Sequence, residues 1–61
     1  MKVSALISDL KADGWYIVRT KGDHRQFKHL IKKGLVTVSG KLSSDVKKGT
    51  LGSVLRQAGL K

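Results

Sequence analysis

The apolar residues at the start of the chain recur with helical spacing. Four of them follow the i, i+3, i+4, i+7 pattern that lines one helix face: Val3, Leu6, Ile7 and Leu10. Ser4 is the expected N-cap, and Gly14 stands where a C′ glycine ends a helix. Asp9 and Asp13 lie four residues apart on the polar side. We interpret them as a solvated helix face rather than a metal pair, because no third carboxylate or histidine is close in sequence.

The segment 15–20 is rich in aromatic and β-branched residues, which favour a β-strand. Both alternating faces of this strand hold apolar residues, so its facing is ambiguous from sequence. Trp15 and Tyr16 could stack on nucleic-acid bases. Packing against the first helix, at the edge of the core, is the favoured interpretation.

Two further strands are predicted, over 24–30 and 35–39, with alternating faces. The side chains expected to face the core are Phe27, Val36 and Val38. A polar loop follows over 40–48, which Leu42 and Val46 are expected to pin to the body of the protein.

A second helix is predicted near the end of the chain, with Thr50 as its N-cap. Its apolar stripe consists of Leu51, Val54, Leu55 and Ala58. Gly59 and Leu60 then match the glycine and the hydrophobic residue of a Schellman motif, which closes a helix.

The predicted order of elements is therefore α-β-β-β-α, an α+β fold. Short links between successive strands imply an antiparallel meander of three strands. Two helices can cover one face of this sheet and leave the other face open to solvent. This is the architecture of double-stranded-RNA-binding domains, and we expect it to form a single domain over residues 1–61.

The charge balance points to a polyanionic partner. Thirteen lysines and arginines face four acidic residues, which gives a formal net charge of +9. Such a surface attracts nucleic acid, where phosphate neutralisation supplies most of the sequence-independent affinity. The chain has no cysteine, no apolar run of membrane-spanning length and no signal-peptide pattern, so we expect a cytoplasmic protein that does not bind membranes.

The stretch 21–29 carries both histidines of the chain. Gly22 and Asp23 read as a turn, because glycine tolerates positive φ and an aspartate can bond to the nearby backbone. If Phe27 faces the core, then His24 has the opposite parity and points to the open face. An imidazole there stays in contact with water and can exchange protons near neutral pH. His24 is therefore the candidate for acid–base chemistry.

The second histidine has a different expected place. His29 shares the parity of Phe27, so we expect it to be partly packed. A mechanism that uses His24 and His29 on one face is disfavoured, because their positions differ by an odd number. Four scattered aspartates and no glutamate also fit poorly with a two-metal phosphoryl-transfer site.

Several segments in this order resemble a known family, the HicA toxins, over nearly the whole chain. The segments are Gly14-Trp15, Lys21-Gly22-Asp23-His24-Arg25-Gln26-Phe27-Lys28-His29, Val36-Thr37-Val38, Gly49-Thr50-Leu51 and Gln57-Ala58-Gly59-Leu60. The Gly-Asp-His turn, the phenylalanine after it and the terminal Gln-Ala-Gly-Leu are together quite specific. The parity argument and the resemblance select the same histidine.

The resemblance implies an mRNA-cleaving toxin of a toxin–antitoxin system that a HicB-type antitoxin neutralises. It implies a metal-independent endoribonuclease with no cofactor and with one essential histidine after the turn, here His24. The candidate phosphate-binding residues are Arg19, Lys21, Arg25 and Lys28, and the sequence does not rank them. The alternatives are a non-catalytic RNA-binding module of the same fold, and a regulatory partner whose basic surface serves only protein contacts.

Overall fold

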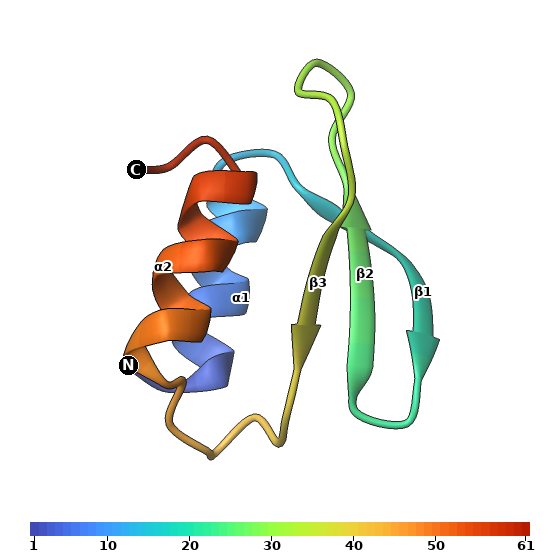
Figure 1. Ribbon diagram of the computed structural model, residues 1–61. Helices are drawn as coiled ribbons and strands as arrows, with labels where there is room; N and C mark the ends of the chain where they lie inside the picture. The colour runs from blue at the N-terminus through green and yellow to red at the C-terminus, as the bar shows by residue number, and fades with distance from the viewer.

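The computed structural model describes residues 1–61 and confirms the predicted order of elements. The elements are α1 (Val3–Ala12), β1 (Tyr16–Lys21), β2 (His24–Lys28), β3 (Val36–Ser39) and α2 (Lys48–Gln57). The three strands form one antiparallel sheet in the order β1-β2-β3. Both helices lie on the same side of this sheet (Figure 1), so the fold is α+β with one open sheet face.

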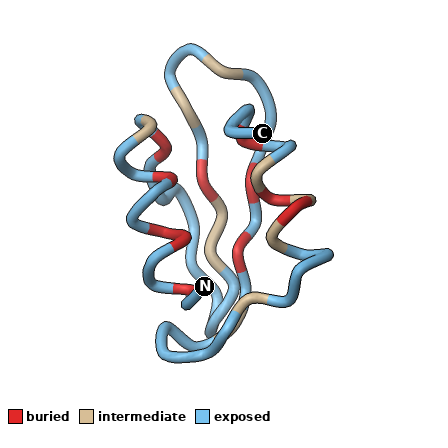
Figure 2. Tube along the Cα trace, turned by 90° about the vertical axis from the view of Figure 1, so that its left-hand side faces the viewer, coloured by how far each residue is buried: buried red, intermediate tan, exposed pale blue.

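The core lies between the helices and the inner face of the sheet, as the positions marked buried in Figure 2 show. It consists of Val3, Leu6, Ile7, Leu10, Trp15, Phe27, Val36, Val38, Val54 and Ala58. The predicted stripe of α1 is buried in full, and so are the three strand residues predicted to face inward. Val54 of α2 and its C-cap Ala58 are buried, and Leu51 and Leu55 pack on the core while half-buried.

The prediction that Ser4 caps α1 is wrong. The N-cap is Lys2, whose side chain makes no capping hydrogen bond. Instead, backbone carbonyls of the loop before α2 accept the free N–H groups of the first turn: Val3 N–H donates to Ser44 at 2.9 Å, and Ser4 N–H donates to Leu42 at 3.1 Å. A tertiary contact thus replaces the side-chain cap.

The loop before α2 and the start of α2 also differ from the sequence-based expectations. Val46 packs against the core, and its N–H donates to the Met1 carbonyl at 2.8 Å, but the Leu42 side chain is exposed. Leu42 therefore holds the loop through its carbonyl and not through its side chain. The prediction that Thr50 caps α2 is also wrong, because α2 begins at Lys48 after the extended N-cap Lys47.

Both helices end at the predicted C′ glycines, and the structure shows Schellman geometry at both ends. Gly14 has a φ of +102°, and the Trp15 N–H donates to the Leu10 carbonyl at 3.0 Å. After α2, the Leu60 N–H donates to the Leu55 carbonyl at 2.8 Å. In α1 this ending delivers Trp15 into the core, so β1 begins one residue later than predicted.

β2 and β3 are shorter than predicted: β2 ends at Lys28, after which the chain turns around His29, and β3 begins at Val36. The His29 ring packs edge-on against Trp15, with ring centroids 5.2 Å apart. Its Nδ1 accepts the N–H groups of Ile31 and Lys32 at 3.0 and 3.1 Å. Its Nε2 therefore carries the proton and donates to the Asp13 carbonyl at 2.7 Å. His29 is partly packed, as predicted, and its ring ties the β2–β3 loop to the end of α1.

Asp13 is not a solvated helix residue, and this part of the prediction for α1 is wrong. It is half-buried, and its carboxylate forms an ion pair with the Lys32 ammonium. The hydrogen bond from Lys32 lowers the pKa of Asp13 from its usual value of 3.8. Lys32 also donates to the Ala58 carbonyl at 3.0 Å. We call Asp13, His29 and Lys32 the clasp, because they join the ends of both helices to the loop after β2.

Candidate nucleic-acid interface

A β-bulge in β1 decides which side chains reach the open face of the sheet. Ile17 pairs with Phe27, but Arg19 pairs with Gln26, so Val18 is an extra residue between two rungs of the ladder. A bulge of this kind reverses the alternation of side chains beyond it. Ile17 therefore lies on the core side with Phe27, whereas Arg19 lies on the open side with Gln26. This bulge is the reason why alternation alone did not show which side chains of β1 face the core.

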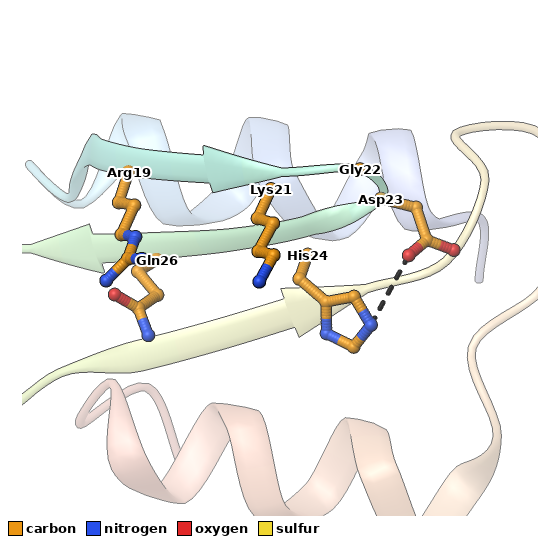
Figure 3. Close-up of a pocket in the computed structure, with 6 residues that line it drawn as sticks. All are labelled: Arg19, Lys21, Gly22, Asp23, His24 and Gln26. Atoms are coloured by element: carbon orange, nitrogen blue, oxygen red, sulfur yellow. Dashed lines mark ion pairs between the residues drawn. The ribbon is translucent and has the colours of Figure 1, made fainter.

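The reversed alternation brings four polar side chains together. Lys21 pairs with His24 at the end of the hairpin, two pairs beyond Arg19 and Gln26, with the Thr20–Arg25 pair between them. Figure 3 shows that all four side chains project from the same side of the sheet. Without the bulge, Arg19 and Lys21 would share the parity of Ile17 and would point toward the helices.

These side chains surround an open depression of about 620 Å³ at the β1–β2 hairpin, lined by Arg19, Lys21, Gly22, Asp23, His24 and Gln26. No apolar side chain contributes to its lining. The hairpin loop has only two residues, and the first of them, Gly22, has a φ of +58°, a conformation that favours glycine. The tight turn thus sets His24 at the mouth of the depression.

The imidazole of His24 is exposed to solvent. The His24 side chain is 66% exposed, and its Nε2 lies 3.4 Å from Oδ1 of Asp23 (Figure 3). The site around the His24 imidazole has no apolar lining residue, whereas the His29 ring packs against Trp15. The His24 imidazole is therefore free to contact a bound molecule and to exchange protons with it.

The candidate cations separate into two groups. Arg19 and Lys21 line the depression beside His24, and neither takes part in an ion pair within the chain. Lys28 is exposed at the far end of β2, where it pairs with Tyr16, and it does not line the depression. Only two of the four candidates therefore gather around the histidine.

Arg25 has a structural place on the opposite side of β2. Its Nη1 donates to the Asp23 carbonyl at 3.2 Å and to the Gly40 carbonyl at 3.0 Å. The Gly40 N–H also donates to the Asp23 carbonyl at 3.2 Å. Arg25 thus holds the hairpin turn against the end of β3, which positions the neighbouring His24.

Gln26 lines the depression but was not among the candidates from sequence. It is half-buried on the central strand, between Arg19 on β1 and Thr37 on β3. The signal that could have identified it is its parity, which equals that of His24. An uncharged amide has no distinctive pattern in a single sequence, and its neighbour Arg19 reaches it only through the bulge.

The depression can hold an anion, because two unpaired cationic side chains face it and the chain as a whole carries +9.

The α-β-β-β-α order, with both helices on one face of the sheet, places the protein in the class of double-stranded-RNA-binding-domain-like folds. No helix is both long and apolar enough to cross a membrane.

The comparison with protein families identifies the chain more narrowly. The family model described as the HicA toxin of bacterial toxin–antitoxin systems matches residues 3–60. The chain therefore belongs to the HicA toxin family, which gives it the role of a toxin. No curated protein matched the chain.

Proposed function

We propose that this toxin acts by cutting RNA, with His24 as the group that transfers protons. The grouping of His24 with Lys21 and Arg19 around one open depression is the observation that carries this proposal. The substrate is mRNA, whose phosphates the two cations hold. The domain that does this spans residues 1–61, and the reaction takes place in the cytoplasm.

RNA supplies its own nucleophile, the 2′-hydroxyl, so the reaction requires no metal ion. The protein must remove the proton of that hydroxyl, protonate the leaving 5′-oxygen and stabilise the charge on the phosphorane between these steps. His24 is exposed enough to contact the reacting atoms and can serve as base, acid or both. Lys21, directly across the ladder from His24, supplies fixed positive charge next to the phosphate.

The other candidate residues take supporting parts in this proposal. Gly22 and Asp23 form the turn that presents His24, and Arg25 holds that turn through the Asp23 and Gly40 carbonyls. Lys28 lies on the open face beyond the depression and contacts the RNA strand farther from the cut.

A HicB-type antitoxin neutralises the toxin by covering the open face around His24. The exposed cations there suit a partner that presents carboxylates. An antitoxin altered only at those carboxylates should bind with a weaker salt dependence than the natural antitoxin. An unchanged salt dependence would show that the acidic groups do not contact this face.

RNA cleavage in EDTA by the purified chain tests the reaction directly. His24→Ala should lower the cleavage rate by about 10²–10⁴-fold, because it removes the general acid–base group. Lys21→Ala should lower cleavage as well, while Lys33→Ala, which removes the same charge from the exposed β2–β3 loop, serves as its matched control. Far-ultraviolet circular dichroism would verify that each variant is folded.

Three results would redirect the proposal. If the chain and His24→Ala bind RNA with a steep salt slope and neither cuts it, the non-catalytic RNA-binding module takes its place. If His24→Ala cuts as fast as the unaltered chain, another residue carries the chemistry. A chain with no RNA affinity would favour a role in protein contacts alone.

A further inference from the structure

Gln26 is a half-buried polar side chain in the depression whose amide makes no hydrogen bond within the chain. Its backbone is held rigidly, because β2 is the central strand and Gln26 pairs with Arg19 on one side and Thr37 on the other. A positioned amide with free donors and a free acceptor is available to a bound molecule.

Gln26 carries the only amide side chain in the depression, and its chemistry differs from that of the charged side chains around it. Arg19 and Lys21 only donate hydrogen bonds, and the Asp23 carboxylate only accepts them. The amide of Gln26 does both at once and carries no charge. Contacts to phosphate position a nucleic acid without reading its sequence, whereas paired donor and acceptor contacts to a base edge do read it. In the proposed reaction Arg19 and Lys21 hold phosphates and His24 contacts the reacting atoms, so Gln26 is the lining side chain left to read a base.

Its distance from His24 places Gln26 within reach of a nucleotide beside the cut. The two residues are two apart on β2 and project from the same face (Figure 3). Successive same-face residues of a strand are about 6.8 Å apart. Arg19, directly across the ladder from Gln26, can hold the phosphate of that nucleotide at the same time.

We infer that Gln26 is a specificity-determining residue that reads the base next to the scissile phosphate and favours adenine. The amide oxygen accepts from N6 of adenine while the amide nitrogen donates to N7, the pairing that glutamine makes with this base. In unpaired RNA this edge of the base is accessible. The inference rests on the proposed RNA cleavage at His24.

Four short RNAs that differ only in the base beside a single cut site would test this. The unaltered chain should cut the adenine RNA about ten-fold faster than the others, within the range of one good bidentate contact. Gln26→Ala should cut all four at similar rates. Gln26→Glu should shift the preference toward cytosine, because a carboxylate accepts from N4 of that base. Thr37→Ala, which alters the exposed neighbour on β3, should retain the preference of the unaltered chain.

The inference is overturned if the unaltered chain cuts the four RNAs equally, or if Gln26→Ala keeps the original preference. Absence of any cleavage would instead contradict the proposed reaction. In that case, binding of the same RNAs to His24→Ala, followed by fluorescence anisotropy, measures the base preference separately. Loss of that preference in the His24→Ala, Gln26→Ala double variant supports the assignment, and its persistence overturns it.

Discussion

The two ends of β2 place the two histidines of the chain in opposite environments. At the hairpin end, His24 is exposed beside a depression, and its Nε2 lies 3.4 Å from the Asp23 carboxylate. At the loop end, His29 is packed against Trp15, and both of its ring nitrogens are engaged by backbone groups. The same side chain is thus available for chemistry at one end and serves structure at the other.

The difference shows how a small protein divides its polar residues between function and stability. A chain of 61 residues has little core, so polar contacts must help to join its elements. The clasp does this by connecting both helix ends to the β2–β3 loop. The hairpin end is instead held by the backbone and by Arg25, which leaves His24 unconstrained.

The largest expected effect at the clasp comes from Gly14→Ala. Gly14 has a φ of +102°, and a Cβ there would lie 2.7 Å from Nε2 of His29. Backbone strain together with displacement of the ring should lower the free energy of unfolding by about 3 kcal/mol. Urea unfolding measures this loss.

Gly34→Ala is the matched control, since Gly34 has a similar φ of +96° but nothing near the added Cβ. It should cost about 1–2 kcal/mol, the strain contribution alone. Equal losses for the two variants would mean that the close approach to His29 adds nothing to the cost.

A smaller effect is expected from His29→Ala, which removes the contacts to Asp13, Ile31 and Lys32. It should lower the free energy of unfolding by about 2 kcal/mol, because backbone donors and a carbonyl lose their partner. His24→Ala should change stability by less than about 0.5 kcal/mol, as is usual at exposed positions.

The two histidine variants should rank in the opposite order when cleavage is measured instead of stability. Cleavage per folded molecule should persist in His29→Ala and fall by about 10²–10⁴-fold in His24→Ala. Thermal unfolding followed by circular dichroism, together with the cleavage assay, would measure both quantities. A stable His29→Ala variant that fails to cut RNA would break the contrast between the two ends of β2.

The smallest effect concerns the pH dependence of stability. Lys32 lowers the pKa of Asp13 below 3.8, so the folded state is favoured by this pair above that pH. The contribution should be lost as the pH falls below 3.8 and through the lower pKa of the folded state. Urea midpoints between pH 7 and acid should therefore fall less steeply in Lys32→Met than in the unaltered chain.

Asp9→Asn, which removes a charge from the exposed side of α1, is the control for this measurement. Equal slopes for Lys32→Met and the unaltered chain would show that the Asp13 carboxylate gains no stability from the ion pair. The pair would then contribute to the geometry of the clasp without a net electrostatic effect.

The sequence by itself determined the features that depend on neighbouring residues. The helical spacing of Val3 to Leu10, the inward faces of Phe27 and Val38, and the glycine that ends α1 all follow from local periodicity and backbone freedom. The outward direction of His24 follows in the same way from its parity with Phe27.

Only the tertiary structure decided the features that depend on a partner far away in the chain. The bulge at Val18 is defined by pairing with β2, and it alone turns Arg19 and Lys21 toward His24. The start of α1 is capped by carbonyls some forty residues away, and Asp13 meets Lys32 across nineteen positions. Local periodicity carries no information about such pairings, because they exist only when the sheet and the helices are packed together.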